Sequence, residues 1–136
     1  MKVKDIMHHV DKVESITKVS QAARIMDQKL IGSILVEERG NVIGILTERD
    51  ILRKVVAKGK DPNTLTAREI MNSPLITIDL NEDIVEASRI MDEKRIRRII
   101  VTEKGRIVGK VTANSISRSL KYLIAAHEPI YTRPEY

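Results

Sequence analysis

Apolar residues recur along the chain at helical spacing in two separate stretches. In each stretch the positions i, i+3, i+4 and i+7 are apolar or small, as on the buried face of an amphipathic helix: Val19, Ala22, Ala23 and Met26 in the first, and Ile84, Ala87, Ser88 and Met91 in the second. Residues 24–27 and 89–92 have the same sequence, Arg-Ile-Met-Asp. We therefore predict two equivalent helices, 65 positions apart.

Each predicted helix is followed by two apolar runs that flank a glycine-containing turn. Residues 34–36 and 42–46 form the first pair of runs, and residues 99–101 and 107–111 form the second. This pattern predicts a β-hairpin in each copy. Because the runs do not alternate polar with apolar residues, we expect both faces of each sheet to be covered.

The remaining elements repeat as well. A short helical pattern at residues 3–7 returns at 67–71, and an extended piece at 13–16 returns at 78–81. The repeat predicts an α/β (α+β) protein made of two β-α-β-β-α units. A half of about 65 residues buries little surface by itself, so we expect the units to pack together about a pseudo-two-fold axis.

The predicted boundaries follow the repeat. Residues 58–63 have the composition of a turn and mark the linker, so the first domain is placed at 1–60 and the second at 61–124. Residues 125–136, which contain Pro129 and Pro134, are expected to form an extended arm.

The end of each hairpin carries the most informative motif. Gly44-Ile45-Leu46-Thr47-Glu48-Arg49-Asp50 ends a strand and opens a helix, and Gly109-Lys110-Val111-Thr112-Ala113-Asn114-Ser115 repeats it in altered form. A strand-to-helix turn exposes backbone N–H groups that attract anions. Thr-x-x-Asp is equally the pattern of a helix N-cap with an acid in the first turn, which needs no ligand. Both interpretations remain open at this point.

Composition narrows the class of protein. Of 136 residues, 42% are hydrophobic and 32% charged, which is typical of a folded globular chain. No apolar run approaches the ~20 residues that span a bilayer, and no signal-peptide pattern is present, so we expect a cytoplasmic protein without a membrane partner. The absence of cysteine excludes disulfides and thiolate chemistry.

Charge is unevenly distributed. Residues 89–121 carry ten Lys and Arg against three Asp and Glu, and this segment accounts for the formal net charge of +5. Such a surface is suited to nucleic acid or to an acidic protein partner. The chain has no Phe or Trp and three Tyr, which counts against an aromatic platform for single strands.

Neither catalysis nor metal binding is expected. His8, His9 and His127 have no spacing that brings three ligands together, so we predict no metal site. The acidic residues near the first motif lack a partnered histidine or nucleophile, so we predict no enzyme. These residues are Glu37, Glu38, Glu48 and Asp50.

The repeated helix, hairpin and Gly-x-x-Thr-x-x-Asp turn together resemble a tandem pair of cystathionine-β-synthase-type (CBS) domains, a Bateman module. The resemblance covers about residues 3–124. It implies regulatory modules that pair as homodimers and bind AMP, ADP, ATP or a related adenosyl ligand such as S-adenosylmethionine between the repeats. No cofactor is required.

The resemblance also implies which residues would line a first cleft. Asp50 would hold the ribose hydroxyls and Thr47 the phosphate, with Ile45 and Arg49 beside them. The second repeat would add phosphate-binding Arg97 and Arg98, an apolar slot for adenine and Asn114 near the phosphate. The slot would consist of Leu75, Ile76, Ile96 and Ile100.

The same resemblance implies a second cleft, which has lost part of the family's residue pattern. Thr112 is kept there, but Ser115 replaces the acid, and Gly32 and Ser33 replace the arginine pair. We expect this cleft to bind nucleotides poorly, and a neutral or non-phosphorylated adenosyl ligand is the alternative left open for it. Two functions therefore remain: an adenine-nucleotide-sensing module that controls an unknown effector protein, or a scaffold that binds nucleic acid or an acidic protein through residues 89–121.

Overall fold

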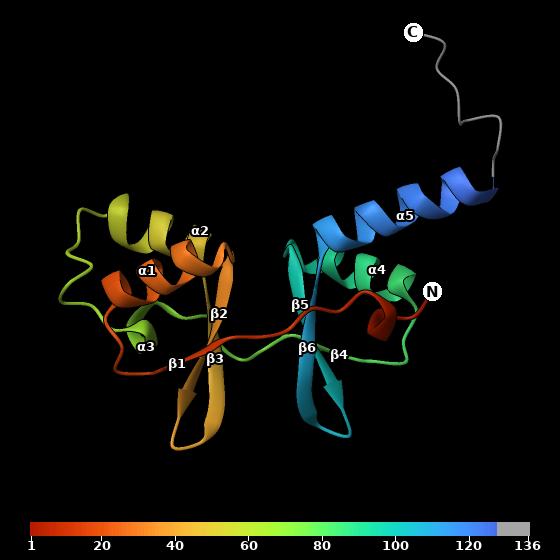
Figure 1. Ribbon diagram of the computed structural model, residues 1–136. Coiled ribbons are helices and arrows are strands. Elements are labelled where there is room, and N and C mark those ends of the chain that lie inside the picture. The colour runs from red at the N-terminus through yellow and green to blue at the C-terminus, as the bar shows by residue number, and fades with distance from the viewer. Residues whose placement is uncertain (128–136) are drawn as a thin grey trace, which may run out of the picture. The chain divides into compact units, whose positions relative to one another are not determined.

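The computed structural model describes residues 1–127. Its α/β elements occur twice in the order strand, helix, strand, strand, helix, which confirms the predicted fold class (Figure 1). In the first copy they are β1 (Lys12–Glu14), α1 (Val19–Lys29), β2 (Ser33–Glu38), β3 (Asn41–Thr47), α2 (Glu48–Asp50) and the π-helix η2 (Ile51–Val56). In the second they are β4 (Thr77–Asp79), α4 (Ile84–Lys94), β5 (Arg98–Glu103), β6 (Arg106–Thr112) and α5 (Ala113–His127).

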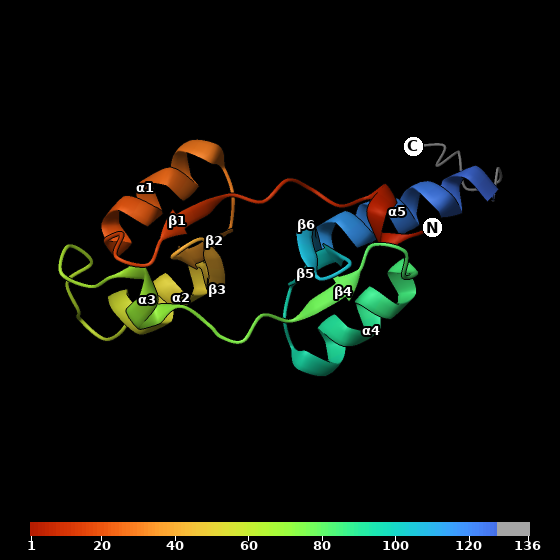
Figure 2. The same ribbon diagram turned by 90° about the horizontal axis from the view of Figure 1, so that it is seen from below.

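Each copy contains one three-stranded sheet, ordered β1-β2-β3 or β4-β5-β6. The first strand runs parallel to the second, and the second pairs antiparallel with the third. Helices α1, α2 and α3 (Ala67–Ile70) gather on one face of the first sheet (Figure 2). The parallel β1–β2 pairing requires a crossover connection, and helix α1 supplies it.

The hairpin turns follow from backbone conformation. Arg39 and Gly40 join β2 to β3 with φ values of 52° and 79°, and Lys104 and Gly105 join β5 to β6 with φ values of 50° and 80°. Two consecutive residues at positive φ are the mark of the type I′ turn, whose twist matches that of paired strands. Glycine at the second position allows both turns to close without strain.

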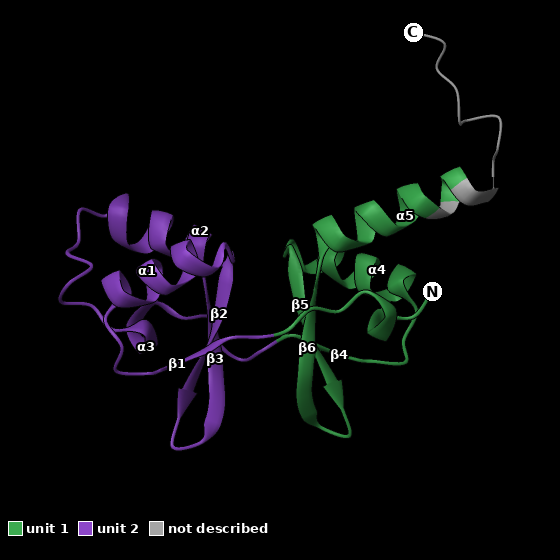
Figure 3. Cartoon of the chain, viewed as in Figure 1, with its two compact units in different colours: residues 1–9, 76–136 green, residues 10–75 purple. Residues whose placement is uncertain are grey.

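The chain divides into two compact units whose boundaries differ from those of the sequence repeat (Figure 3). Unit 2 is Val10–Leu75, and unit 1 combines Met1–His9 with the chain from Ile76 onward. The short helix at the start of each repeat thus packs with the other repeat's sheet: η1 (Val3–Asp5) joins unit 1 and α3 joins unit 2. The packing of the two units about a pseudo-two-fold axis stays a prediction.

Burial explains this exchange. Val3 of η1 is fully buried in the core of unit 1, where it joins Ile78, Ala87 and Val101. Ala67 of α3 is equally buried in the core of unit 2. The predicted helix faces supply both cores, apart from half-buried Ala23 and exposed Ser88.

After each short helix the chain crosses the last strand of the sheet as an extended strap. In unit 2 the strap (residues 71–73) pairs with β3 through two backbone hydrogen bonds between Asn72 and Ile45, of 2.8 and 3.0 Å. In unit 1 the strap (residues 7–9) pairs with β6 through His8 and Lys110, at 2.7 and 2.9 Å. The two straps therefore cross equivalent points of the two motifs.

The motif glycines lie under these crossings. A Cβ atom on Gly44 would stand 2.7 Å from the carbonyl oxygen of Asn72, and one on Gly109 would stand 2.9 Å from that of His8. Real Cβ atoms do not approach backbone oxygen so closely. The glycine of each motif thus serves a close backbone contact, which is the usual meaning of glycine within a strand.

Helix α5 continues through His127, three residues beyond the predicted end of the second domain, and the rest of the predicted arm lies outside the described residues. Within residues 1–127, no helix combines the length and the apolar character needed to cross a membrane.

Alanine at Gly44 tests the crossing in unit 2. Its methyl group would meet the Asn72 carbonyl at 2.7 Å and the flexible Met71 side chain at 2.5 Å. Because the strap is fixed by backbone hydrogen bonds, we expect Gly44→Ala to lose about 1–3 kcal/mol of unfolding free energy in urea denaturation. Gly109→Ala, with a 2.9 Å contact, should lose less.

The control is Ser88→Ala on the exposed face of α4, which should stay within about 0.5 kcal/mol of wild type. A Gly44→Ala protein as stable as this control would contradict the proposed role of the glycine.

Candidate functional site

The turn from β3 into α2 is closed by a reciprocal capping box. The Thr47 hydroxyl accepts a 3.2 Å hydrogen bond from the Asp50 amide, while the Thr47 amide donates to Asp50 Oδ2 at 2.9 Å. The Thr47 hydroxyl also donates to Asp50 Oδ2 at 2.8 Å. The capping interpretation of Thr-x-x-Asp is thereby confirmed, whereas its ligand interpretation stays a prediction.

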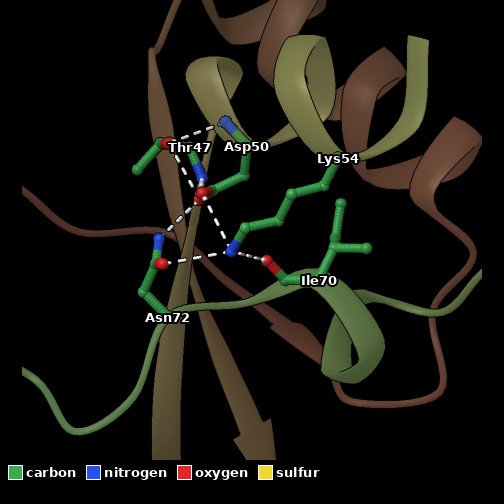
Figure 4. Close-up of polar contacts among 5 residues, drawn as sticks. All are labelled: Thr47, Asp50, Lys54, Ile70 and Asn72. Atoms are coloured by element: carbon green, nitrogen blue, oxygen red, sulfur yellow. Dashed lines mark hydrogen bonds and ion pairs between the residues drawn. The ribbon is translucent and has the colours of Figure 1, made fainter. Parts of the chain in front are cut away.

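Asp50 is only 7% exposed, and both of its carboxylate oxygens have partners (Figure 4). Besides the two bonds from Thr47, Oδ2 accepts a 2.7 Å bond from the side-chain amide of Asn72. Oδ1 lies 3.2 Å from the ammonium nitrogen of Lys54, one helical turn further along the chain. A buried carboxylate requires such partners because an unpaired buried charge is strongly destabilising.

Lys54 connects this carboxylate to the strap. Its ammonium group donates to the Ile70 carbonyl at 2.9 Å and to Asn72 Oδ1 at 3.1 Å, in addition to the ion pair with Asp50 (Figure 4). Asp50, Lys54 and Asn72 therefore contact one another pairwise, and we call them the Asp50 triangle. It joins the motif turn, helix η2 and the strap.

Unit 1 has a counterpart at the same place with a serine instead of the carboxylate. The Ser115 amide donates to the Thr112 hydroxyl at 3.1 Å, and the two hydroxyls lie 2.7 Å apart. His8 Nε2 lies 2.7 Å from the Ser115 hydroxyl, so His8 occupies the position that Asn72 has in unit 2. Ser119 stands where Lys54 would be and donates to the carbonyl of Ser115 in its own helix.

The helix that precedes the strap of unit 2, α3, is also held against the sheet. Arg68 of α3 donates to both carboxylate oxygens of Glu38 on β2 at 2.6 Å, and Ser15 donates to the same carboxylate at 2.9 Å. Hydrogen bonding from Arg68, and then from Ser15, lowers the pKa of Glu38. These contacts hold α3, and with it the start of the strap, against the sheet.

Each unit has a groove beside the first turn of its last helix. In unit 2 the groove has a volume of about 510 Å³ and is lined by residues that include Gly32, Glu48 and Leu30. In unit 1 it has about 430 Å³ and includes Ile96 and Arg97. Two of the residues predicted to contact ligand, Gly32 and Arg97, thus occupy equivalent positions in equivalent grooves.

The structure brings part of the predicted first site together. Thr47 and Asp50 are in hydrogen-bond contact, with half-buried Ile45 on β3 and exposed Arg49 on α2 nearby in sequence. Leu75 ends the same unit and is half-buried.

The other predicted contributors to this site belong to unit 1. Arg97 and Asn114 are exposed, Arg98 is half-buried, and Ile100 is only 2% exposed on β5. Ile76 and Ile96 pack partly against the core of unit 1. The approach of the arginines to Asp50 stays a prediction.

For the second site, buried Ser33 and half-buried Gly32 lie in unit 2, whereas Thr112 and Ser115 lie in unit 1. Only the contact between Thr112 and Ser115 is formed within one unit.

Sequence reasoning missed Asn72 and Lys54, and it considered His8 only as a metal ligand. Two signals were available. Asn72 and His8 each follow a repeated Ile-Met pair at the 64-residue offset, and Lys54 stands four residues after Asp50, the spacing of a helical ion pair. Their convergence depends on the path of the strap, which no local pattern indicates.

Among the described residues, no group of three or more His, Cys, Asp or Glu side chains is placed to hold a metal ion. His8 instead hydrogen-bonds Ser115, as described above.

Comparison with known proteins identifies the fold. The sequence profile of the CBS domain matches residues 3–57 and 67–122. A solved structure of an uncharacterized conserved protein from Pyrococcus horikoshii matches with a TM-score of 0.83 and 33% identity, covering 88% of this chain and 92% of that one. The chain belongs to the CBS-domain family, as a tandem pair.

Two relatives are similar in sequence to most of this chain. An uncharacterized protein of Methanopyrus kandleri is 38% identical over 113 residues, which cover 82% of this chain and 58% of that protein. Hypoxic response protein 1 of Mycobacterium tuberculosis is 37% identical over 103 residues, covering 75% of this chain and 72% of that protein. The chain thus spans little more than half of the Methanopyrus relative. CBS pairs generally act as regulatory, ligand-binding modules.

Removing the amide of Asn72 tests the Asp50 triangle as a stabilising contact. Asn72→Ala deletes a 2.7 Å donor to a nearly buried carboxylate, so we expect a loss of about 1.5–3 kcal/mol of unfolding free energy in urea denaturation. Asn63→Ala, at an exposed asparagine of the same unit, is the matched control and should change stability by less than about 0.5 kcal/mol. Equal stabilities for the two variants would show that the Asn72 side chain contributes nothing to folding through its contacts with Asp50 and Lys54.

Proposed function

We propose that this chain is a non-catalytic regulatory module that binds an adenine nucleotide through Asp50 and signals occupancy to a partner protein. AMP, ADP and ATP are the candidate ligands, with S-adenosylmethionine as a further adenosyl ligand. No cofactor is required. The proposal includes a homodimer of modules, supported by large apolar side chains that each unit leaves exposed, among them Leu30 and Tyr122.

The single observation that supports this proposal best is the state of Asp50. Its carboxylate is held in one position by donors from three different elements, and Asp50 is the last residue of the repeated motif. A carboxylate accepts hydrogen bonds from a vicinal diol, and hydrogen bonds to charged groups are worth about 1.5–3 kcal/mol each. A preorganised acid of this kind is suited to holding a ribose.

The difference between the units supports one nucleotide site rather than two. Unit 1 has the Ser115 hydroxyl, the His8 imidazole and the Ser119 hydroxyl where unit 2 has the Asp50 carboxylate, the Asn72 amide and the Lys54 ammonium group. A serine hydroxyl lacks the charge that strengthens hydrogen bonds to sugar hydroxyls. The unit 1 position is therefore proposed to take a neutral adenosyl ligand or none.

The alternative function, a scaffold that uses the basic surface of residues 89–121, receives less support. Arg89 forms ion pairs with Glu86 at 2.7 Å and Glu93 at 2.6 Å. Hydrogen bonding to Glu86, and to a lesser degree Glu93, raises the pKa of Arg89, and the same contact lowers that of Glu86. One cation of this surface is thus already neutralised within its own helix.

Isothermal titration calorimetry with AMP, ADP, ATP and S-adenosylmethionine tests the proposal. We expect at least one of these ligands to bind wild type and Asp50→Ala to bind it about ten- to a hundredfold more weakly, because the ribose loses its charged acceptor. Ser115→Ala, the equivalent change in unit 1, is the control and should leave that affinity within about twofold.

The alternative makes the opposite prediction. Binding of RNA or DNA that weakens steeply with salt and is unchanged in Asp50→Ala, together with no binding of the adenosyl ligands, would favour the scaffold.

A further inference from the structure

A diol that binds Asp50 meets a carboxylate whose two oxygens already have donors within the Asp50 triangle and from Thr47. Oδ2 accepts three hydrogen bonds, two from Thr47 and one from Asn72, and Oδ1 faces the ammonium group of Lys54. A carboxylate offers about four acceptor positions in total. A diol that uses both oxygens of Asp50 therefore competes with donors already in place, with Thr47 and Asn72 at Oδ2 and with Lys54 at Oδ1.

Lys54 is the partner whose displacement has consequences elsewhere. An ammonium group has three N–H donors, and its three acceptors here are Asp50, Asn72 and the carbonyl of Ile70. Opening the contact to Asp50 removes the charged one of these acceptors. Lys54 is then left with the two neutral acceptors from α3 and the strap, the Ile70 carbonyl and Asn72 Oδ1.

Helix η2 has an unusual backbone that its counterpart lacks. The Ala57 amide bonds the Leu52 carbonyl at 2.8 Å and the Lys60 amide bonds that of Val55 at 3.0 Å, both at the i→i+5 spacing of a π-helix. π-helical turns are rare and less favourable than α-helix, so other contacts must stabilise them. The equivalent helix α5 is α-helical from Ala113 to His127 and has Ser119 in place of Lys54.

We propose that Lys54 is a positioning residue that latches Asp50 and holds η2 in its π-helical form, and that a ligand with a vicinal diol opens this latch. The inference rests on the proposed function of Asp50. When the diol takes the carboxylate, Lys54 is released and residues 51–56 move toward the α-helical geometry that α5 already has.

The change would be visible on the surface of the same helix. Leu52 is 59% exposed and Val56 is 65% exposed, although both are large apolar residues on η2. They stand four positions apart, as neighbours on one face of a helix. Conversion of residues 51–56 from π-helical to α-helical geometry rotates the residues before this segment relative to those after it. The latch thus connects ligand at Asp50 to the apolar surface that a partner would contact.

Two variants separate the latch from a general effect of charge. Lys54→Met removes the ammonium group but keeps an unbranched side chain, and we expect it to bind AMP about three- to tenfold more tightly because no ion pair has to be broken. Arg53→Met removes the neighbouring exposed cation without touching the triangle and should bind AMP within about twofold of wild type. Lys54→Arg restores a cation and should return the affinity toward wild type.

Nuclear magnetic resonance reports the helix directly. Backbone amide and ¹³Cα shifts of residues 51–57 should move when AMP binds wild type. Ligand-free Lys54→Met should show shifts in the same direction, whereas Arg53→Met should not. The 2′,3′-dideoxy analogue of AMP lacks the diol and should leave these shifts unchanged.

The outcomes distinguish the latch from the function on which it rests. If AMP binds wild type but residues 51–57 do not respond, or Lys54→Met binds no more tightly, the latch is wrong and the nucleotide site stands. If AMP and the other adenosyl ligands fail to bind at all, the proposed function is wrong. In that case the ligand-free variants still test whether Lys54 holds helix η2. If Lys54→Met gives the same chemical shifts as Arg53→Met, Lys54 does not hold the helix and the latch is wrong too.

Discussion

The crossing of a strap over a glycine is the constraint on which both units depend. Two backbone hydrogen bonds fix each strap to the last strand, and only a residue without a side chain fits beneath them at Gly44 and Gly109. This contact carries Asn72 to the end of one motif and His8 to the end of the other. The chemistry of each motif is therefore completed by a residue from the opposite repeat.

The same scaffold supports two different polar sites. In unit 2 the strap and helix surround a carboxylate with an amide and an ammonium group, and in unit 1 they surround a hydroxyl with an imidazole. A buried charge needs hydrogen-bond donors or an opposite charge close by. Asp50 therefore has four donors around its carboxylate, whereas the neutral Ser115 hydroxyl needs fewer. A duplicated fold can thus keep its architecture while one copy specialises for a charged contact.

In unit 2 the ribose binding that we propose would use the same carboxylate that stabilises the fold. Donors from Thr47, Asn72 and Lys54 already contact the two oxygens of Asp50, so the proposed ligand would compete with them. Such an exchange links occupancy to whatever the displaced groups were holding. In this chain Lys54, one of these donors, also joins helix η2 to Ile70 and to Asn72 of the strap.

Local sequence patterns were sufficient to predict the repeated elements, because helix and strand periodicities and glycine turns are local properties that occur twice. The sequence also offered the Thr47–Asp50 capping contact as one of two interpretations of the motif, because a capping box spans only four residues. It did not determine the unit boundaries or the roles of Lys54 and Asn72. Those were decided by the tertiary structure, because a strap crossing a distant strand brings together residues whose separation along the chain carries no periodic signal.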